Sequence, residues 1–523
     1  MRYRFMLKLL TLVACNITLV ISATAQSRPL VFHELYHDTS APVREYSSLA
    51  MSGAVHPIER PRPLQRAIPG RISPGPDAAE QPFALPPVSA SIGLNFDGIP
   101  NSANGTLIGI PSDSNLSVGD TQLVETINTA YEVYDKATGK SFFPAQQIST
   151  IFTGMPGLCG QGVTFFFTDP IVLYDKIAGR WIISIVAANT SFSTGNECIA
   201  VSATSDATGR YHRYAFRFGN DNFNDYPKLA VWPDAYYASY NLFTPTSASA
   251  LACAYDRFAM MAGKHTSVIC FDNPSEFSFL PSDLDGSNLP PSGEPNFYVD
   301  LATRSSLHLY RFHVDFTTPS NSTFTGPVRI PVRPFSPACH GGVCIPQAGT
   351  KQRLDSLADR LMFRLAYRNM LTHESLLVNH SVTTSAAPAG VRWYEIRDPD
   401  GTPSTFQEGT IKDGDLSLWM GSIAMDKTGD IAVGFSESSK TTHPAIAFTG
   451  RVPSDPLNTM ESPALIWQGQ GSELRADRWG DYTSLVIDPS DDCTFWYVNQ
   501  YMPSDGVVNF HTRVASFKFP NCQ

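Results

Sequence analysis

Charged residues are scarce in this chain. Asp, Glu, Lys and Arg make up 16% of its 523 residues, and the formal net charge is −10. The basic residues form no cluster, whereas a nucleic-acid-binding protein presents a basic patch, so we expect no nucleic-acid partner. Beyond the N-terminus, no apolar run is long enough to cross a bilayer, which predicts that the chain has no membrane span.

Complete catalytic motifs are also missing. His373-Glu374 with His380 lacks the spacing of a His-Glu-x-x-His zinc motif, and the segment is better explained as a hairpin. Ser436 lies in Gly434-Phe-Ser-Glu-Ser438, which is not the Gly-x-Ser-x-Gly turn of a serine hydrolase. No glycine-rich phosphate loop precedes a helical pattern. The sequence therefore identifies no reaction.

Glycine, proline and aromatic residues are plentiful: the chain has 36 Gly, 40 Pro and 11% aromatics. This composition favours an all-β extracellular protein. The first residues agree, because a basic start (Arg2, Arg4, Lys8) precedes an apolar run over 9–21 and a small-x-small site at Ala23-Thr-Ala25. We predict a signal peptide over 1–25, cleaved after Ala25, and a secreted or periplasmic protein. Lipid attachment at Cys15 is the alternative.

Eight cysteines remain after cleavage, and an even number in an exported chain suggests disulfides. Sequence does not determine their connectivity. Pairing of neighbours is the simplest hypothesis: Cys159–Cys198, Cys253–Cys270, Cys339–Cys344 and Cys493–Cys522. The Cys339-His-Gly-Gly-Val-Cys344 segment could also be a redox or metal motif, but we favour a short disulfide loop.

The mature chain divides into two parts. Residues 26–91 are predicted to form an extended, proline-rich N-terminal segment, with nine prolines between 57 and 87. Residues 92–523 are predicted to form one domain built from a unit that recurs about every sixty residues. Each unit has an opening with Asp or Gly, an apolar strand, a turn and further strands. The openings lie at 113–119, 169–170, 225–228, around 296–316, near 355, at 420–422 and at 478–482.

The fifth unit shows the strand pattern best. Leu361, Phe363, Leu365 and Tyr367 alternate with the residues between them, which is the period of a strand. Candidate strands follow at 375–382, 391–397 and 406–411, and four consecutive antiparallel strands make a propeller blade. We therefore predict a β-propeller of seven four-stranded blades. Because the last unit has only three clear strands, a strand from about 93–110 should close the ring beside the C-terminal strand, with Cys493–Cys522 fastening that blade.

Several Asp-to-Gly pieces recur within the units, such as 135–139, 175–179 and 426–429. Asp accepts backbone N–H bonds in a tight turn, and Gly supplies a positive φ where the chain reverses. These pieces are predicted to be hairpin turns and not sites.

The innermost strands of a propeller line its channel, so the residues just before them should meet at one mouth. The candidate ligand-binding residues are Asp113, Asp169, Asp225, Tyr226, Lys228, Asp355, Trp479, Asp481 and Tyr482. The carboxylates could bind Ca²⁺ through oxygen ligands, or two of them could perform acid and base steps on a glycoside. The aromatic rings would suit stacking on sugars. The alternative is structural, since an Asp before a strand often caps backbone N–H groups.

Long motifs resemble those of a family of secreted, mainly bacterial proteins of unknown function. They are Asp113-Ser-Asn-Leu-Ser-Val-Gly119, Asp169-Pro-Ile-Val-Leu-Tyr-Asp175 with Arg180-Trp181, Asp225-Tyr-Pro-Lys228 with Trp232-Pro-Asp234, Arg478-Trp-Gly-Asp-Tyr482, and Asp491-Asp-Cys-Thr-Phe-Trp-Tyr497. The resemblance covers about 95–523, and 37–42 also resembles an N-terminal motif of some members. It brings no catalytic residues.

Sialidases are similar only at the level of the fold. They need an arginine triad and Ser-x-Asp-x-Gly-x-x-Trp boxes, and 205–209 matches such a box poorly.

We therefore expect a secreted, monomeric propeller that binds an extracellular glycan or protein ligand at the channel mouth. No cofactor is identified, although Ca²⁺ fits the carboxylates. The alternative is a glycoside hydrolase or lyase that uses two carboxylates from Asp169, Asp225, Asp355 and Asp481.

Overall fold

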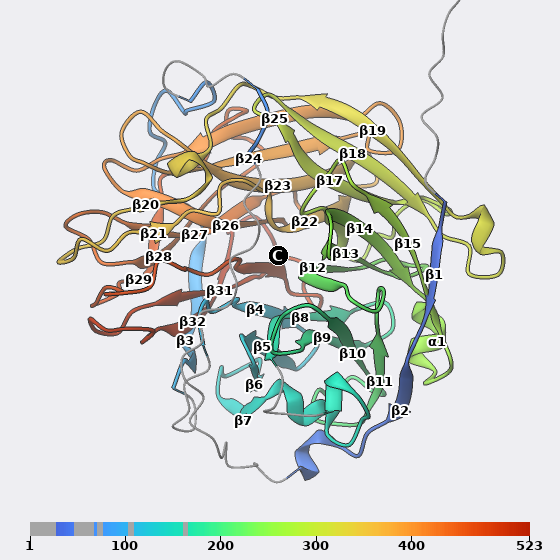
Figure 1. The fold of residues 1–523 in the computed structure, drawn as a ribbon. Coiled ribbons are helices and arrows are strands. Elements are labelled where there is room, and N and C mark those ends of the chain that lie inside the picture. The colour runs from blue at the N-terminus through green and yellow to red at the C-terminus, as the bar shows by residue number, and fades with distance from the viewer. Residues whose placement is uncertain (1–27, 47–66, 71–76, 103–108, 161–165) are drawn as a thin grey trace, which may run out of the picture.

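The computed structural model describes residues 28–46, 67–70, 77–102, 109–160 and 166–523. Within these ranges the chain is almost entirely β-sheet, arranged around a central axis (Figure 1). The predicted signal peptide and Cys15 lie outside the described residues, as does most of the proline-rich stretch. No helix in the described ranges has the length and apolar character that a membrane crossing requires.

Antiparallel strands follow one another in groups of four. The first groups are β4 (Asn115–Val118), β5 (Gln122–Ile127), β6 (Ala130–Asp135) and β7 (Ser141–Gln147); then β8 (Phe166–Asp175), β9 (Arg180–Ala188), β10 (Gly195–Ser202) and β11 (Tyr211–Phe216); then β12 (Phe223–Val231), β13 (Tyr236–Phe243), β14 (Ala248–Tyr255) and β15 (Ser267–Asn273).

The middle of the chain continues the pattern. It contains β16 (Leu280–Asp285), β17 (Asn296–Thr303), β18 (Ser306–His313) and β19 (Thr323–Pro331), which form the unit that was indistinct in the sequence, followed by β22 (Met362–Asn369), β23 (Glu374–Val382), β24 (Gly390–Arg397) and β25 (Ser404–Ile411). The last strands are β26 (Ser417–Met425), β27 (Ile431–Ser438), β28 (Ala445–Arg451) and β29 (Ala464–Trp467), then β30 (Ser484–Ile487), β31 (Phe495–Tyr501) and β32 (His511–Lys518).

Short elements complete the structure. They are β20 (Val343–Ile345) paired with β21 (Leu354–Asp355), the helix α1 (Arg257–Met261), and the 3₁₀ turns η1 (Val43–Glu45), η3 (Ile148–Phe152), η4 (Leu158–Gly160), η6 (Pro319–Asn321) and η7 (Ala338–Gly341).

The first strand of each group lies next to the axis. Each of these strands contacts the first strand of the next group, in the order β4, β8, β12, β16, β22, β26 and β30, and β30 contacts β4 again. Between β16 and β22 the contact is a parallel pairing, with Ser282 opposite Leu365. Sheets set radially around an axis in this way form a β-propeller, and large apolar side chains such as Phe279, Tyr298 and Phe324 fill the space between them.

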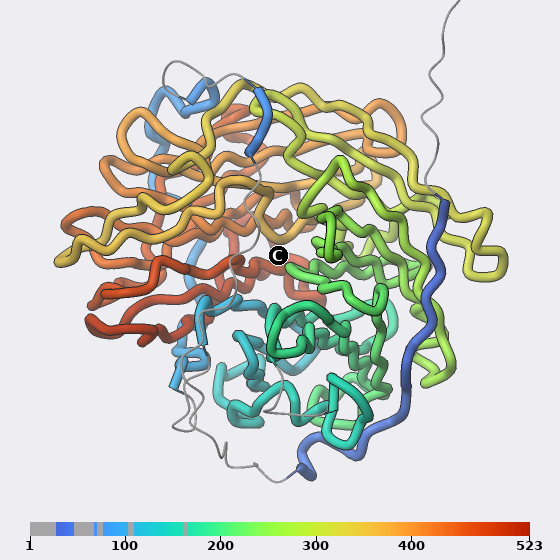
Figure 2. Tube along the Cα trace, in the orientation of Figure 1, coloured from blue at the N-terminus to red at the C-terminus, as the bar shows by residue number. Residues whose placement is uncertain are grey.

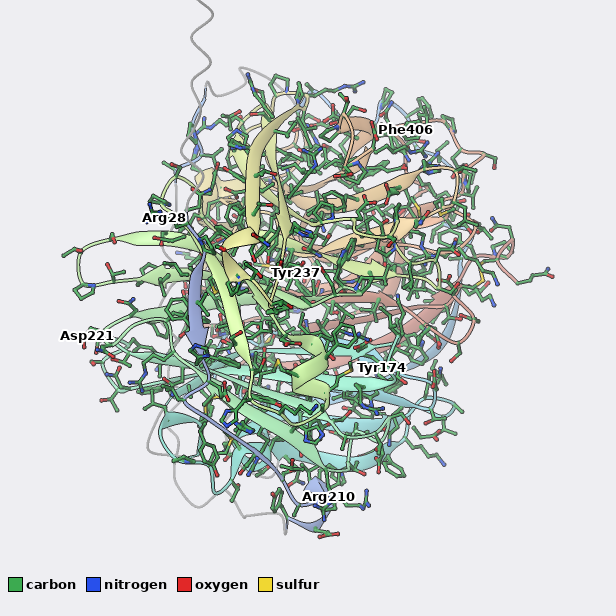
Figure 3. All side chains as sticks on the ribbon, turned by 90° about the vertical axis from the view of Figure 1, so that its right-hand side faces the viewer. Arg28, Tyr174, Arg210, Asp221, Tyr237 and Phe406 are labelled. Carbon is green, nitrogen blue, oxygen red and sulfur yellow. A yellow bond between two sulfur atoms is a disulfide. The ribbon has the colours of Figure 1, made fainter. Side chains whose placement is uncertain are left out.

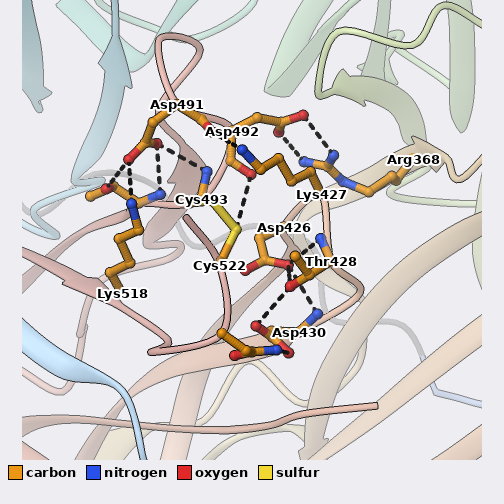
Figure 4. The surroundings of a disulfide bond; sticks show 12 residues. Arg368, Asp426, Lys427, Thr428, Asp430, Asp491, Asp492, Cys493, Lys518 and Cys522 are labelled. Atoms are coloured by element: carbon orange, nitrogen blue, oxygen red, sulfur yellow. Dashed lines mark hydrogen bonds and ion pairs between the residues drawn. A yellow bond between two sulfur atoms is a disulfide. The ribbon is translucent and has the colours of Figure 1, made fainter.

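The strand β3 (Ser91–Pro100) pairs with β32, so that Ile92 lies opposite Phe517 and Phe96 opposite Val514. This pairing places residues 91–100 beside the C-terminal strand. The Cys493–Cys522 disulfide fastens the end of the same sheet (Figure 4). All four cysteine pairs predicted from neighbouring positions are at disulfide distance.

The described part of the N-terminal segment from Arg28 to Tyr46 runs along the outside of the ring (Figures 2 and 3). β1 (Leu30–His33) adds to the outer edge of β15, and β2 (Tyr36–Thr39) adds to β11. Further on, Glu80 bridges to Thr410 and Pro87 to Ser462. The part of 26–91 that the structure describes therefore includes two strands, which the aperiodic sequence did not reveal.

Each innermost strand has a residue in the left-handed conformation either a few residues before its first residue or within its first half. These residues are Asp113, Asp169, Tyr226, Ser278, Leu357, Met420 and Asp481, with φ between 42° and 60°. In β8, β12 and β26 the pairing with the second strand shifts at this point, which is the behaviour of a β-bulge. A β-bulge changes the direction of the side chains around it. The left-handed residues near the starts of the innermost strands therefore bring polar side chains from several sheets together at one end of the axis.

Candidate functional site

The repeated bulge gathers a group of charged residues that we call the start cluster: Asp113, Asp169, Asp225, Lys228, Arg478 and Asp481. They come from sheets distant in sequence, yet their charges act on one another. The sequence predicted all of them except Arg478. Arg478 could have been recognised, because it precedes Trp479-Gly-Asp481 in the same motif.

Lys228 is the most enclosed cation of the start cluster, with a side chain that is 1% exposed. Its ammonium lies 3.4 Å from the ring centroid of Tyr226 and 4.1 Å from that of Tyr482, and it donates a hydrogen bond to the carbonyl of Pro227. Burial lowers the pKa of Lys228 to about 8, against the opposing effect of Asp169. Cation–π contacts therefore replace much of the solvation that this ammonium loses.

Two arginines pair with acidic residues within three positions in sequence. Arg478 forms a buried ion pair with Asp481. Arg360 pairs with Asp359 at 2.9 Å, and its guanidinium lies 4.7 Å from the ring of Tyr226. The Asp481 carboxylate is thus tied to a cation, although burial still raises its pKa.

Asp225 is the most open carboxyl of the start cluster. It lies deep in the ring but keeps accessible surface, so it borders a space that water can enter. Its carboxyl accepts no hydrogen bond from the described part of the chain, whereas most of its neighbours are bonded. Burial, followed by the charge of Asp169, raises the pKa of Asp225 to about 8. Asp225 therefore holds a proton more readily than an ordinary aspartate, and its protonated form can donate a hydrogen bond.

Asp113 and Asp169 share one partner, Asn128, which the sequence did not single out. The Asn128 amide donates to Asp113 at 2.7 Å, and its oxygen accepts from the backbone N–H of Asp169 at 3.0 Å. The second oxygen of Asp113 is buried without a hydrogen bond among the described residues. Burial, with the charges of Asp169 and Asp481, raises the pKa of Asp113 well above its usual value.

Asp355 differs from the start cluster in its hydrogen bonding, although the charges of Asp481 and Arg478 act on it. It belongs to β21, ahead of β22, and its carboxylate accepts the N–H of Leu357 at 3.0 Å. Burial raises the pKa of Asp355 to about 6. The hydrogen bond is the backbone-capping arrangement that formed the structural alternative for these acids.

The aromatic candidates face protein on all sides. Trp479 donates to the Ser436 hydroxyl at 3.0 Å and lies against Trp419. The Tyr482 hydroxyl donates to the carbonyl of Pro170, and that of Tyr226 to the carbonyl of Asp481. All three rings are at most 1% exposed. In this conformation they support the start cluster and offer no surface for stacking a sugar.

One acidic residue near the cluster escaped the sequence prediction. Glu197 lies in β10, hydrogen-bonded to the Asn224 amide at 3.0 Å, and burial raises the pKa of Glu197 to about 8. No local signal could have identified it, because β10 is buried along its whole length and shows no alternation.

Comparison with known proteins finds no matching family model and no matching curated protein. Solved structures do show a distant likeness. A chain from the S. cerevisiae complex of dbp5 with nup159 and gle1 is 8% identical, with 84% of this chain and 98% of that chain covered and a TM-score of 0.38. The Podospora anserina α-L-arabinofuranosidase is 12% identical, with 70% and 95% covered and a TM-score of 0.29.

A Trypanosoma rangeli sialidase mutant with trans-sialidase activity is 10% identical, with 67% of this chain and 54% of that chain covered and a TM-score of 0.30. Scores this low carry no argument about activity, so the function has to be inferred from the residues themselves.

Proposed function

We propose that this protein is a secreted β-propeller of seven four-stranded blades, closed by β3 beside β32, whose start cluster binds an extracellular ligand. The cyclic contacts of the innermost strands and the β3–β32 pairing support the closed ring. The observation that carries the binding proposal is Asp225: a deep carboxyl with accessible surface, no hydrogen-bond partner among the described residues, and a raised pKa.

Hydroxyl-rich groups fit this chemistry, and we propose a glycan as the ligand class. A sugar hydroxyl can accept a hydrogen bond from a protonated Asp225 and donate one to the nearby Asp169 or Asp113. Such hydrogen bonds would satisfy carboxyl oxygens that lack partners among the described residues, including one oxygen of Asp113.

The test is a glycan array followed by calorimetry on the hits, comparing the wild type with Asp225→Asn and Asp221→Asn. Asp221 is an exposed control four positions earlier, at the rim in Figure 3. We expect Asp225→Asn to weaken binding at least about tenfold, because removing a buried polar contact costs about 1–3 kcal/mol. Asp221→Asn should bind normally. Equal affinity in both variants would reject the start cluster as the binding site.

A glycoside hydrolase or lyase is the second candidate, favoured by the raised pKa of Asp225. Asp225 would act as the general acid and a neighbouring carboxylate, Asp169, as the base or nucleophile. A polysaccharide turnover screen separates the two proposals: product formation that disappears in Asp225→Asn indicates catalysis, and binding without product indicates a binding protein.

The remaining expectations are also proposals. We propose that the protein is exported after cleavage at Ala25, functions as a monomer, and can hold Ca²⁺ beside Asp113 and Asp169. N-terminal mass analysis, light scattering and metal analysis after dialysis test these three points in turn.

A further inference from the structure

Glu34, His37 and His265 converge on the outer face of the ring. The His265 Nδ1 lies 2.5 Å and the His37 Nδ1 3.1 Å from the same oxygen, Glu34 Oε1. The three potential ligand atoms lie within 4.8 Å of one another, and this is the one such trio of His, Cys, Asp or Glu within the described ranges. The histidine rings are 4.3 Å apart.

We propose that Glu34, His37 and His265 bind one divalent transition-metal ion of the zinc class. Two imidazole nitrogens and one carboxylate oxygen are a donor set that Zn²⁺ accepts, and a tetrahedral ion with bonds of about 2.0–2.1 Å places its ligands about 3.4 Å apart. The two measured separations need to lengthen by less than about 1 Å. This inference is independent of the function proposed for the start cluster.

Neighbouring contacts already orient two of the ligands. The other oxygen of Glu34 accepts the backbone N–H of Thr266 at 3.2 Å, which fixes the carboxylate. The His37 ring stacks on Tyr214 with an interplanar angle of 13°. Hydrogen bonds and packing of this kind around metal ligands hold them in the geometry that binding requires. The side chain of His265 is 91% exposed and extends from the loop before β15.

A bound ion would be open to solvent. Glu34 and His265 line a surface groove together with His33, Asp256 and Phe316. Water can therefore complete the coordination, as it does in zinc sites that have three protein ligands.

An ion at this position would attach the N-terminal segment to the ring. Glu34 lies between β1 and β2, and His37 lies in β2, where the N-terminal segment passes from the sheet of β15 to the sheet of β11 (Figure 1). His265 belongs to the ring itself. An ion held by all three would fasten the N-terminal segment across two adjacent sheets, because metal binding stabilises whichever state holds the complete site.

Untagged mature protein, stripped with a chelator, is titrated with Zn²⁺ by calorimetry and with Co²⁺ by visible absorption. The variants are His265→Ala, Glu34→Gln and the control His33→Ala, an exposed histidine in the same groove. We expect one equivalent of zinc in the wild type and in His33→Ala. His265→Ala and Glu34→Gln should each bind at least about tenfold more weakly, since even the loss of a supporting residue costs 10–100-fold.

Limited proteolysis gives a second measurement. Zinc should slow cleavage within 30–39 in the wild type and in His33→Ala but not in His265→Ala, whose exposed side chain contributes little to folding. Absence of stoichiometric zinc binding by the wild type would overturn the proposal. Wild-type affinity in both His265→Ala and Glu34→Gln would do the same.

Discussion

Both ends of the central axis contain buried charged residues, but these residues are paired with partners to different degrees. At the end opposite the start cluster, Arg364 donates to both oxygens of Asp285 at 2.6 and 2.7 Å and to Asp283 at 3.2 Å. Lys176 donates to the carbonyl of Leu284 at 2.6 Å. We call these four residues the end cluster: Lys176, Asp283, Asp285 and Arg364. Its two acids face two bases.

The start cluster has four carboxyl groups and two basic side chains. One acid, Asp481, is paired with Arg478, while Asp225 accepts no hydrogen bond from the described residues and an oxygen of Asp113 is buried without one. Fully paired charges are expected where a cluster serves the fold, and unsatisfied groups with shifted pKa values are expected where a cluster serves binding or catalysis. Burial also lowers the pKa of Lys176 in the end cluster to about 8, so the two clusters differ in hydrogen bonding more than in pKa shifts. This difference supports the proposals that the end cluster stabilises the fold and that the start cluster binds a ligand.

Breaking the pairing of the end cluster should have the largest effect on stability. Arg364→Gln leaves two buried carboxylates without their cation, and we expect a loss of about 3–5 kcal/mol. Denaturant unfolding followed by tryptophan fluorescence measures it. Arg329→Gln, on an exposed stretch of β19, is the matched control and should change stability by less than about 0.5 kcal/mol. Equal midpoints for the two variants would contradict the structural role of the end cluster.

The disulfides should rank by the length of chain that they close. Cys493 and Cys522 are 29 residues apart, and replacing both with Ser should cost about 3–4 kcal/mol through the entropy of the unfolded chain. Cys339 and Cys344 are 5 apart, so the same double replacement should cost only about 2 kcal/mol. Unfolding midpoints of the two double variants give the order, and the reverse order would show that folded-state contacts dominate.

In the start cluster, removing an acid should raise stability. The pKa of Asp225 is raised to about 8 in the fold, so its protonated form is favoured there and its ionisation weakens the fold as pH rises from about 4 to 8. Asp225→Asn should therefore be more stable than the wild type at pH 8, by about 1–2 kcal/mol for a partly solvated carboxyl, and equal to it near pH 4.

Thermal midpoints across this pH range, with Asp221→Asn as the control, check the sign of the effect. A variant less stable than the wild type at pH 8 would place Asp225 with the structural acids of the end cluster.

Much of the fold could be predicted because its signals are local. The period-two pattern of 361–368, the turns that separate strands and the even cysteine count each depend on neighbouring residues, and the structure has β22 and the four disulfides where these signals indicated. The N-terminal strands β1 and β2 gave no such signal. They are short edge strands with mixed exposure, and their pairing depends on partners more than 170 residues away.

The site was predictable only in part, for a related reason. The Asp residues of the start cluster and the aromatic residues beside them lie in motifs that the sequence shows. The burial of these residues depends on how the innermost strands of several sheets pack against one another, which no single motif specifies. Asn128 and Glu197 come from segments outside these motifs. The cluster of Glu34, His37 and His265 joins positions 231 residues apart, which no local pattern connects.

The smallest expected change in stability comes from replacing an aspartate whose hydrogen bonds stay within its own turn. Asp135 opens a predicted Asp-to-Gly turn, where its carboxylate accepts the N–H and the hydroxyl of Thr138 at 2.9 and 2.6 Å and Gly139 has a φ of 67°. Asp135→Ala should lose about 0.5–1.5 kcal/mol, the net value of such hydrogen bonds, because water can replace part of the contact at this half-buried position. Thermal unfolding measures the loss, with Lys140→Ala in the same turn as the control.

Repeating the measurement from about pH 4 to 8 compares Asp135→Ala directly with Asp225→Asn. A flat difference for Asp135→Ala and a pH-dependent difference for Asp225→Asn would separate an acid of the framework from an acid of the site within one experiment. If the stability difference from the wild type did not change with pH for either variant, ionisation would not distinguish Asp225 from an acid of the framework. The proposed difference between the start cluster and the end cluster would then be contradicted.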